Sequence, residues 1–566
     1  MKWIKKTPKR RVNPNDSIEE QIASIRGIKD VNRFLSPTEN ELFDPYEMKN
    51  IEDASNRILK AIHNNENILA SYDPDADGVT ATTVMLRYLK NYTDNVDYIY
   101  GERNDGHGIT EQLRIKGLDE EKDAERLERS KSNLEKVKKC DLLILIDSSS
   151  NDVETCKNIS ELFNCDIIVL DHHAIERENP YVLLVNPQQE GCAYPNKYLS
   201  GAGVVFKTIQ VIEDNLGQVD VWQYVDLVAV GIYADIMRID VLENRYLIMH
   251  GLRNVKNTGL LRILKGAKAD LYKLNCDSIG FSIAPMINGV ARMDNIKLAI
   301  DIFLEDDDNI CKKIRLQMFK LNELRKEKQK EIVNQYLTKV NPNEKVLIVF
   351  DEQSSKGFNG IVAQQLSDIY KRPAIVGRIH KGTISGSFRS YAGFDMKSFL
   401  NDSNLIEEAM GHPQAGGFVL KEDNLEHLEK YIEFNLPKLD DTEPTVIYDI
   451  EIDVKDVIEY IGVSEKFNLL AGNGFPKLVI RIKNITVEEQ VCIGKTEETV
   501  KIKTFDDMEL IRFKVDKNYA SELGYFDNID AIGQLSMNEF YNFGLKKKIS
   551  TPQMIISDYK IKTDES

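Results

Sequence analysis

Short apolar segments alternate with helix-like segments between about residues 50 and 300, and this alternation constrains the fold more than any other feature. The segments "NILASYD", "VDYIYG", "DLLILIDSSS" and "DIIVLDHH" are rich in β-branched and aromatic residues, as strands are. Strands that alternate with helices predict a parallel, doubly wound sheet. Because the carboxyl ends of parallel strands meet at one edge of such a sheet, residues far apart in sequence meet there.

An acidic stretch, "DPDADG", follows the first of these segments and contains Asp73, Asp75 and Asp77. Alternating carboxylates before a glycine are typical of the start of an EF-hand calcium loop. Such a loop would need a Glu at its twelfth position, where the chain has Val84, and a helix before it, where the chain has a strand pattern. We therefore expect the stretch to join a strand to a helix at 81–90, the usual place for active-site residues in an α/β sheet.

Three further features follow apolar segments, and we expect them at strand ends as well. Asp147 follows one strand, the triplet at 171–173 (Asp-His-His) follows the next, and Asp235 follows "AVGIYA". Singly, each has an ordinary explanation, such as a helix cap or a structural histidine. Together with the acidic stretch they are like charges that repel unless a cation compensates. Oxygen ligands with an imidazole suit Mn²⁺ or Mg²⁺, and two such ions about 3.5–4 Å apart are a recognised device for hydrolysing phosphate esters.

The charge distribution limits the partners. A net charge of −17 argues against a non-specific, histone-like DNA binder. Residues 355–394 nevertheless carry six Lys or Arg against the single acid Asp368, which gives +6 − 1 = +5. We therefore expect a local basic region that could hold a polyanion.

Cysteine use and the N-terminus indicate the compartment. Seven scattered cysteines without a CxxC pair argue against both a disulfide framework and a zinc ribbon. No apolar run approaches the roughly 18 residues of a membrane span, and the basic start "MKWIKKTPKRR" lacks the apolar core of a signal peptide. We expect a cytoplasmic protein without membrane association, whose basic N-terminal end is frayed and solvated.

A chain of 566 residues is too long for one core, and its pattern changes along the sequence. A charged helical pattern from about 290 to 338 indicates a connector, with Leu316, Phe319, Leu321 and Leu324 near one side. A second α/β unit follows, with "GGFVL" as an edge strand, and the strand-rich C-terminal part indicates a small barrel such as an OB-fold. The expected parts are an N-terminal segment, a first α/β domain, a connecting helix, a second α/β domain and a barrel, at 1–48, 49–300, 301–338, 339–438 and 445–566.

Several motifs carry a family resemblance. "DPDADG", "IDSSS", "LDHH" and "YADIM" resemble the four motifs of the DHH phosphoesterase superfamily, named for the triplet at 171–173. "CAYPNKYLSGAGVVFK", "ENRYLIMHGLRNV", "FSIAPMINGVARM" and "NLLAGNGFP" are similar to stretches of the RecJ family of single-strand-specific 5′→3′ DNA exonucleases. "FNGIVAQQLSDIYKRPAIV", "SGSFRS" and "GHPQAGGF" resemble the DHH-associated domain. The resemblance runs from about residue 50 to the C-terminus, in the family's domain order.

The resemblance implies a fold and an activity. The fold is an α/β DHH-type parallel-sheet domain, joined by a long helix to a smaller α/β DHH-associated domain and followed by an OB-like β-barrel. The activity is the metal-dependent 5′→3′ degradation of single-stranded DNA to 5′-mononucleotides, in DNA repair and recombination. Single-stranded DNA is the implied partner of a monomeric enzyme, with a single-strand-binding protein and a helicase as further partners.

The resemblance also implies roles for particular residues. Two divalent ions, Mn²⁺ or Mg²⁺, would be held by Asp75, Asp77, Asp147, His172 and Asp235, with Asp147 bridging. In the catalytic set, Asp73 would support this cluster and His173 would contact the scissile phosphate. The substrate would be bound by Arg103, Arg292, Ser387, Arg389, Gly411, His412 and Gly417.

Some positions depart from the family's pattern. The usual Gly-Tyr-Gly becomes Gly106-His107-Gly108, one residue closer to Arg103. In the usual Arg-Ile-Asn-Ala-Ala-Gly-Arg-Met, the first Arg is replaced by Met286. These changes indicate a divergent member.

Two other functions fit part of the pattern. A DHH-type phosphodiesterase acting on short oligonucleotides or cyclic dinucleotides would need neither the C-terminal β domain nor the long connector. A non-catalytic replication scaffold would have lost some of the acids, whereas the set is intact here.

Overall fold

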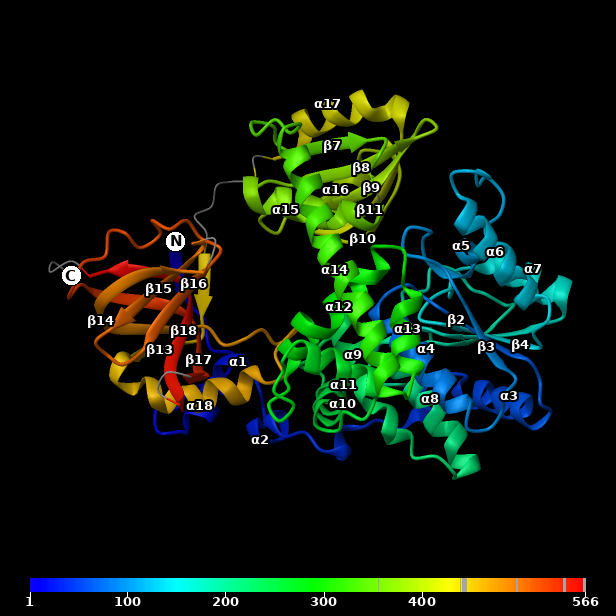
Figure 1. The fold of residues 1–566 in the computed structure, drawn as a ribbon, viewed down its shortest axis with the longest axis horizontal. Coiled ribbons are helices and arrows are strands. Elements are labelled where there is room, and N and C mark those ends of the chain that lie inside the picture. Colours follow the sequence, from blue (N-terminus) through cyan, green and yellow to red (C-terminus); the bar gives the residue numbers. More distant parts are fainter. Residues whose placement is uncertain (355, 438, 440–444, 495–496, 543–545, 563–566) are drawn as a thin grey trace. The chain divides into compact units, whose positions relative to one another are not determined.

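The structure is a computed structural model, and it describes residues 1–566 except 355, 438, 440–444, 495–496, 543–545 and 563–566, and except the side chains of 408 and 540–542. The chain divides into two compact units (Figure 1). The larger unit contains residues 43–237 and 247–440, and the smaller unit contains residues 1–42, 238–246 and 441–566. The finer five-part division expected from the sequence stays a prediction.

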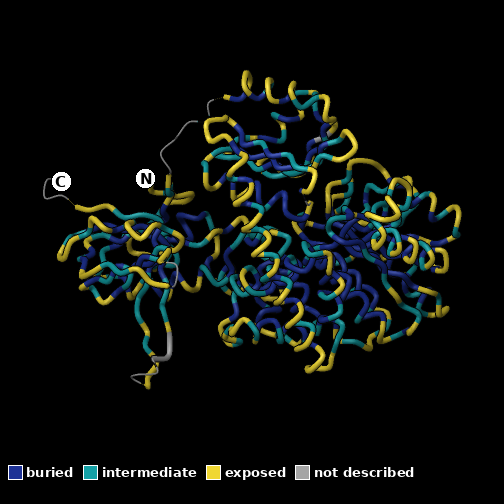
Figure 2. Tube along the Cα trace, turned by 45° about the horizontal axis from the view of Figure 1, so that its top comes forward, coloured by how far each residue is buried: buried dark blue, intermediate teal, exposed yellow. Residues whose placement is uncertain are grey.

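A parallel sheet of five strands organises the first part of the larger unit, in the order β3-β2-β4-β5-β6. Its strands are β2 (Ile68–Tyr72), β3 (Val96–Tyr100), β4 (Leu142–Ile146), β5 (Asp166–Leu170) and β6 (Leu183–Val185). All four pairings are parallel. β2 and β4 are buried along their whole length, as strands covered on both faces are (Figure 2). The predicted parallel α/β sheet is confirmed.

Helices from this part of the chain pack on the sheet and on one another. They are α3 (Ile51–His63), α4 (Ala76–Leu89), α5 (Gly108–Gln112), α6 (Ala124–Val137), α7 (Val153–Phe163), α8 (Gly201–Leu216) and α9 (Val225–Ala234). α4 packs against β2, α8 and α9 and is almost entirely buried. The segment that follows β2 is therefore fixed by the strand on one side and by two helices on others.

A helical segment leads to the long helix α14. It comprises α10 (Leu242–Arg253), α11 (Thr258–Gly266), the π-helical turn η4 (Ser278–Ile283), α12 (Ala284–Ala291), α13 (Lys297–Leu304) and α14 (Asp308–Leu337). Of the apolar residues noted near one side of this helix, Leu316, Phe319 and Leu324 are exposed. The buried stripe instead includes Met318 and Asn322, since α14 packs against α11, α12, α13 and α15. No described helix is long and apolar enough to span a membrane.

A second sheet completes the larger unit, in the order β10-β11-β9-β8-β7. Its elements are β7 (Leu347–Asp351), α15 (Lys356–Tyr370), β8 (Ala374–His380), β9 (Thr383–Arg389), α16 (Met396–Asp402), β10 (Ile406–His412), β11 (Ala415–Lys421) and α17 (Leu425–Asn435). Only the pair β7–β8 is parallel. The "GGFVL" segment lies in β11, which is an inner strand rather than the predicted edge. The edge strand next to β11 is β10. Its charged sequence "IEEAMGH" does not show the pattern typical of a strand.

The smaller unit is built on a mostly antiparallel six-stranded sheet. Its strands are β13 (Ile450–Asp453), β14 (Ile480–Ile493), β15 (Thr499–Thr504), β16 (Glu509–Phe513), β17 (Asn528–Asn542) and β18 (Lys547–Ile561). β14 pairs with both β15 and β17, and β16 pairs with β18, so five strands form a closed cycle of pairings. The OB-like assignment of this ring stays a prediction. The helices of the unit include α1 (Ile18–Arg26), α2 (Val31–Leu35) and α18 (Val457–Asn468).

The N-terminal end is not frayed, contrary to the expectation from its basic residues. β1 (Lys2–Lys5) pairs in parallel with β12 (Thr445–Tyr448), and the Trp3 ring nitrogen donates to Asp558 at 2.8 Å. Lys6 lies 3.7 Å from the Asp449 carboxylate. Backbone pairing and ion pairs therefore hold the basic end on the smaller unit.

A buried ion pair inside the smaller unit gives a prediction of stability. Arg26 donates to both carboxylate oxygens of Asp449, at 2.6 and 2.5 Å. We expect Asp449→Ala to lower the free energy of unfolding by about 3–5 kcal/mol, because it leaves a buried guanidinium without its charged partner. The double variant Arg26→Met, Asp449→Leu should lose less. Denaturant titration of the three proteins checks this, and a loss below about 1 kcal/mol in Asp449→Ala contradicts it.

Candidate metal and phosphate site

The acidic stretch forms a tight junction between β2 and α4. The helix begins at Ala76 rather than at Ala81 as expected, because Asp75 caps it by accepting the N–H groups of Asp77 and Gly78 at 3.0 and 3.1 Å. A β-carbon at Gly78 would lie 2.3 Å from the carbonyl oxygen of Asp73. The glycine therefore allows a close approach of helix and loop, and it does not serve a turn.

The N-terminus of α8 holds the carboxylate of Asp77. The N–H of Gly201 donates to Oδ2 at 2.6 Å, and the N–H of Ala202 and the hydroxyl of Ser200 donate to Oδ1 at 3.0 Å. The free N–H groups and the positive end of the dipole make a helix N-terminus a natural partner for a carboxylate. Asp77 is thus fixed in a buried position by a segment more than a hundred residues further along the chain.

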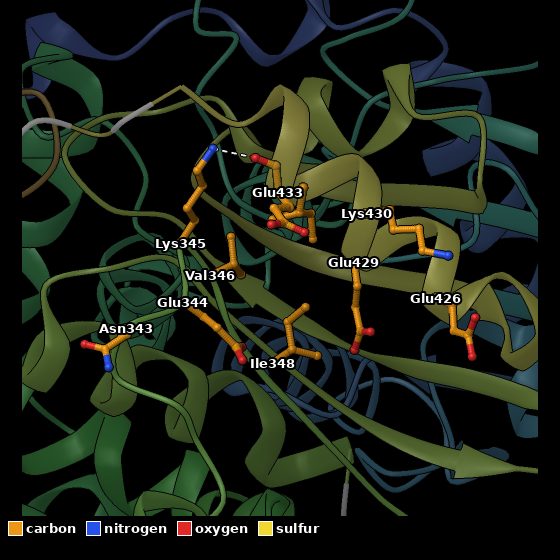
Figure 3. A pocket seen from close by; sticks show the side chains of 10 residues that line it. Asn343, Glu344, Lys345, Val346, Ile348, Glu426, Glu429, Lys430 and Glu433 are labelled. Atoms are coloured by element: carbon orange, nitrogen blue, oxygen red, sulfur yellow. Dashed lines mark hydrogen bonds between the residues drawn. The ribbon is translucent and has the colours of Figure 1, made fainter.

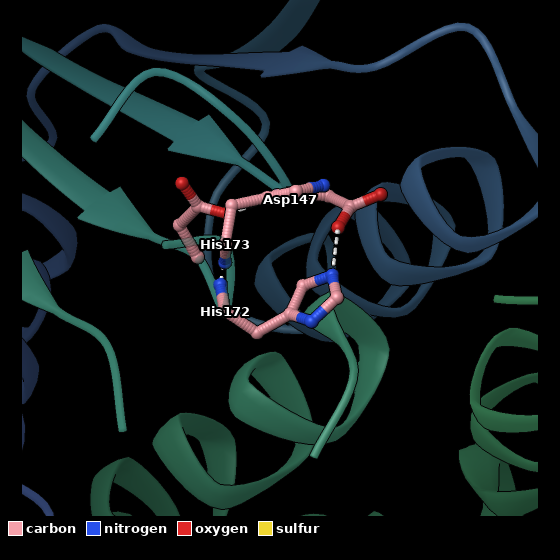
Figure 4. A group of neighbouring side chains, drawn as sticks. Asp147, His172 and His173 are labelled. Carbon is pink, nitrogen blue, oxygen red and sulfur yellow. Dashed lines mark hydrogen bonds and ion pairs between the residues drawn. The ribbon is translucent and has the colours of Figure 1, made fainter. Parts of the chain in front are cut away.

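Asp77 and two more carboxylates converge on the ring of His172. Its Nε2 lies 3.1 Å from Oδ1 of Asp147, 3.3 Å from Oδ2 of Asp235 and 3.8 Å from Oδ2 of Asp77. Figure 4 shows the His172 ring directed at the Asp147 carboxylate. Asp235 comes from the C-terminal end of α9 and not from a strand end as expected. The structure therefore brings together four of the five predicted metal ligands within direct contact distances.

The backbone is strained where Asp147 leaves β4. Its φ is +60°, and Ser149 two residues later has a φ of +76°. Side chains other than glycine rarely adopt this left-handed region, and such residues persist where the surroundings over-determine them. With this backbone conformation, the Asp147 carboxylate is directed toward His172.

Asp171, the first residue of the triplet, organises both histidines. It accepts hydrogen bonds from the Ser150 hydroxyl at 2.6 Å, the His172 N–H at 2.7 Å and Nδ1 of His173 at 2.7 Å. Burial opposes ionisation, but these bonds hold the pKa of Asp171 well below its usual range. Burial also opposes charging of His173, but the Asp171 carboxylate raises the pKa of His173 to about 10. The Asp171 carboxylate therefore favours the protonated form of the half-exposed His173, whose other ring nitrogen is free of the Asp171 bond.

Electrostatics in the cluster favour a cation. Burial and then the neighbouring carboxylates raise the pKa of Asp147 well above its ordinary value and that of Asp235 to about 8. Burial and Asp73 also raise the pKa of Asp75. Burial and the adjacent His173 lower the pKa of His172, so its imidazole is neutral, which is the form that binds metals. A divalent cation would relieve the repulsion of the carboxylates.

Unsatisfied atoms point to the same conclusion. Oδ1 of Asp73, Oδ1 of Asp147 and Nε2 of His172 are buried and have no hydrogen-bond partner among the described residues. Buried polar groups without partners are rare and call for a missing ligand or ion. Carboxylate oxygens with one imidazole are the donor set that Mn²⁺ and Mg²⁺ accept. These residues therefore fit a divalent cation.

Two residues of the β3–α5 loop reach the acidic junction. Nη1 of Arg103 donates to the Pro74 carbonyl oxygen at 3.5 Å, and Arg103 is near enough to Asp75 to oppose the rise in its pKa. Nδ1 of His107 lies 2.6 Å from Oδ2 of Asp73. His107 was noted in the sequence only as a departure from the family pattern, and its contact depends on a loop conformation that no motif encodes.

Arginines gather beside the first turn of α15. Arg292 donates to the carbonyl oxygen of Gly357, and burial with the nearby Arg103, Arg325 and Arg389 lowers the pKa of Arg292 to about 9. A β-carbon at Gly360 would lie 2.8 Å from Nη2 of Arg389 and 3.6 Å from Oγ of Ser387. The structure thus brings together Arg103, Arg292, Ser387 and Arg389, and it adds Gly360 and Arg325, which the sequence did not indicate.

The three remaining predicted residues lie at the β10–β11 hairpin. Gly417 stands opposite Ser387 in the register of β11 and β9. Gly411, with a φ of +102°, lies opposite Gly416, where a β-carbon would meet the Gly416 Cα at 2.8 Å. His412 is exposed at the strand end. No described hydrogen bond or ion pair joins His412 to the arginines.

One pocket of the larger unit is lined by none of the predicted site residues. A hollow of about 740 Å³ is lined by residues of the segment before β7 and of α17, among them Glu344, Glu426, Glu429 and Glu433 (Figure 3). Neighbouring Glu344 and Glu426, after burial, raise the pKa of Glu429. Such an acidic hollow is unsuited to a polyanion.

Comparisons with known proteins found relatives in sequence and in fold. Residues 67–232 match the family model "DHH family, N-terminal domain". The chain is 30% identical to the single-stranded-DNA-specific exonuclease RecJ of Bacillus subtilis over 93% of its own length and 65% of that relative, which is just under two thirds. It is 29% identical, over 98% of both chains, to the putative single-strand DNA-specific exonuclease of Bacillus phage SPbeta. The crystal structure of RecJ with Mn²⁺ from Thermus thermophilus shares the fold, with a TM-score of 0.77 at 20% identity over 99% of this chain and 79% of that one.

The raised pKa values give a prediction about pH and metal. A carboxyl group whose pKa rises on folding favours the folded state at low pH, and this contribution is lost as the pH rises through its folded pKa. For Asp235 that loss runs from about pH 4 to the folded pKa of about 8. We expect the metal-free protein to melt at a lower temperature at pH 8.5 than at pH 6, and Mn²⁺ to raise Tm more at pH 8.5. Calorimetry in EDTA and in Mn²⁺ checks this; a Mn²⁺ effect that is larger at pH 6 contradicts it.

Proposed function

We propose that the chain is a RecJ-like member of the DHH phosphoesterase superfamily, which degrades single-stranded DNA from the 5′ end to 5′-mononucleotides. One observation carries the proposal. The buried carboxylate cluster adjoins a group of arginines, and Arg103 lies near both Asp75 and Arg292. A cation site beside an anion site can hold the scissile and the terminal phosphate of one strand together.

We assign the cations to the predicted ligands. Asp75, Asp77, Asp147, His172 and Asp235 would hold two divalent ions, Mn²⁺ or Mg²⁺. When bound, such ions activate water and polarise the phosphoryl group. The α8 N-terminus and the strained Asp147 backbone keep the ligands in place before substrate arrives.

The protein's own groups would position and stabilise the reacting phosphate. His173, held as a cation by Asp171, can donate a hydrogen bond to a phosphate oxygen where negative charge develops. Water adds to phosphorus, the O3′–P bond of the terminal nucleotide breaks, and O3′ takes up a proton. The shortened strand keeps the phosphate as its new 5′ end. Asp73 would support the junction through its contact with His107.

Each turnover therefore creates a 5′-phosphate that the arginines can bind again. Arg292 and Arg389 can make charge-assisted hydrogen bonds to it, and Ser387 can donate a further one. Gly411 and Gly417 leave the backbone of the hairpin open to a close approach, with His412 at the periphery, whereas Arg103 lies near both Asp75 and Arg292. We assign the OB-like ring of the smaller unit to the single strand beyond the site. Phe475 of this unit is not available to stack on a base, because it is buried against Phe34 and Phe467.

The context follows from the same proposal. We place the protein in the cytoplasm as a monomer in DNA repair and recombination, with a single-strand-binding protein and a helicase as partners.

Removing the charge of the Asp147 carboxylate tests the proposal. We predict that Asp147→Asn lowers the rate of mononucleotide release from single-stranded DNA by about 10³-fold or more, because the ligand nearest to His172 loses its charge. The matched control is Asp97→Asn, an exposed position on β3 that pairs with Lys136. The measurement is release from end-labelled DNA in Mn²⁺ or Mg²⁺.

Substrate length separates the proposal from its rivals. A rate that falls as the strand is shortened to di- and trinucleotides supports the exonuclease. Equal or faster cleavage of dinucleotides or cyclic dinucleotides would instead indicate the small-substrate phosphodiesterase. Absence of both Mn²⁺ binding and cleavage in the wild type would indicate a scaffold.

A further inference from the structure

The long helix α14 carries a half-buried arginine that the proposed function has not used. Nε of Arg325 donates to Oδ1 of Asn322 at 3.1 Å, and its Nη1 donates to Oε1 of Gln329 at 2.8 Å. Both partners are neutral amides. Glu323, one of the two acids nearest in sequence, pairs with Lys326 at 2.7 Å instead. Within the described part of the chain, no carboxylate forms an ion pair with Arg325.

Amide side chains fix this arginine between two other helices. Asn322 also donates to Sδ of Met286 on α12 at 3.8 Å. Gln329 donates in turn to Oε1 of Gln365 on α15 at 3.0 Å. Asn322 is buried, and a β-carbon at Gly289 of α12 would lie 2.6 Å from its Oδ1. The direction of the Arg325 guanidinium is therefore set by packing.

Arg292, at the C-terminal end of α12, is near enough to Arg103, Arg325 and Arg389 for their charges to add to the effect of burial and lower its pKa. The described hydrogen bonds of Arg103, Arg292 and Arg389 go to backbone carbonyl oxygens, of Pro74, Gly357 and Phe388. A guanidinium has five N–H donors and no acceptor, so most donors in the group face no protein acceptor. Like charges held together in a partly buried place are costly unless an anion joins them.

We propose that Arg325 is a substrate-binding residue that donates hydrogen bonds to the 5′-terminal phosphate of the strand. This inference rests on the proposed function and names a residue of its phosphate subsite. A terminal phosphate carries close to two negative charges and three acceptor oxygens, whereas a 5′-hydroxyl carries no charge. Four guanidinium groups provide the positive charge and the N–H donors that complement the charge and the acceptor oxygens of such a phosphate. The helix α14 is thus a wall of the site in addition to a connector.

The test measures binding without catalysis. The probe is a 3′-fluorescein single-stranded oligothymidylate in EDTA, with either a 5′-phosphate or a 5′-hydroxyl, followed by fluorescence anisotropy. Arg325→Gln should weaken binding of the 5′-phosphate strand by about tenfold or more and that of the 5′-hydroxyl strand by less than about threefold. Arg325→Lys should recover part of the loss. Lys326→Gln removes the same charge from the neighbouring exposed position and should leave both strands within about twofold.

Each other outcome has a definite meaning. Equal weakening by Arg325→Gln and Lys326→Gln would overturn the inference, since only long-range charge would then matter. So would an unchanged preference for the 5′-phosphate in Arg325→Gln. A wild type that binds neither strand in EDTA and releases no mononucleotides in Mn²⁺ overturns the proposed function itself. Thermal melting of the variants, expected to stay close to that of the wild type because glutamine can still bond Asn322 or Gln329, shows that the comparison is made between folded proteins.

Discussion

Mutual repulsion among buried and half-buried carboxylates is the constraint on which the rest of the larger unit depends. Asp75, Asp147 and Asp235 have raised pKa values because burial and their neighbours disfavour the charged form. Each charge placed there destabilises the others, so the arrangement needs a compensating interaction. Binding a divalent cation provides that interaction, and the unsatisfied oxygen of Asp147 and nitrogen of His172 lie where the cation is needed.

The elements around the cluster hold these carboxylates together and place positive charge beside them. The parallel sheet brings β2, β4 and β5 to a common edge, so the acidic junction, Asp147 and the triplet meet there. The N-terminus of α8 holds Asp77 by backbone hydrogen bonds. Asp171 favours the protonated form of His173, whereas burial and His173 favour the neutral form of His172. The arginines beside α15 supply the opposite charge. Cation and anion subsites side by side are the arrangement that a phosphate chain requires.

The sequence was sufficient where a motif is local and insufficient where tertiary packing decides. Asp73, Asp75, Asp77 and Asp147 follow strands directly, so periodicity alone placed them at one edge. Asp235 ends a helix, and its nearness to His172 depends on how α9 packs on α4. Arg325 and Gly360 could not be predicted, because nothing in a charged helix or a glycine indicates which neighbour it will meet. The side of α14 that is buried could not be identified from the apolar residues Leu316 and Phe319, which are exposed, because the helix buries a mixed stripe between several helices. The strand β10 was missed because its sequence is charged.

Anomalous diffraction from crystals grown with Mn²⁺ tests the central claim most directly. The account predicts two anomalous peaks in the larger unit, both within coordination distance of the Asp147 carboxylate, with Asp75, Asp77, His172 and Asp235 completing the ligand sets. A map with no peak beside Asp147, or with manganese only at exposed acids such as Glu426 and Glu429, would contradict it.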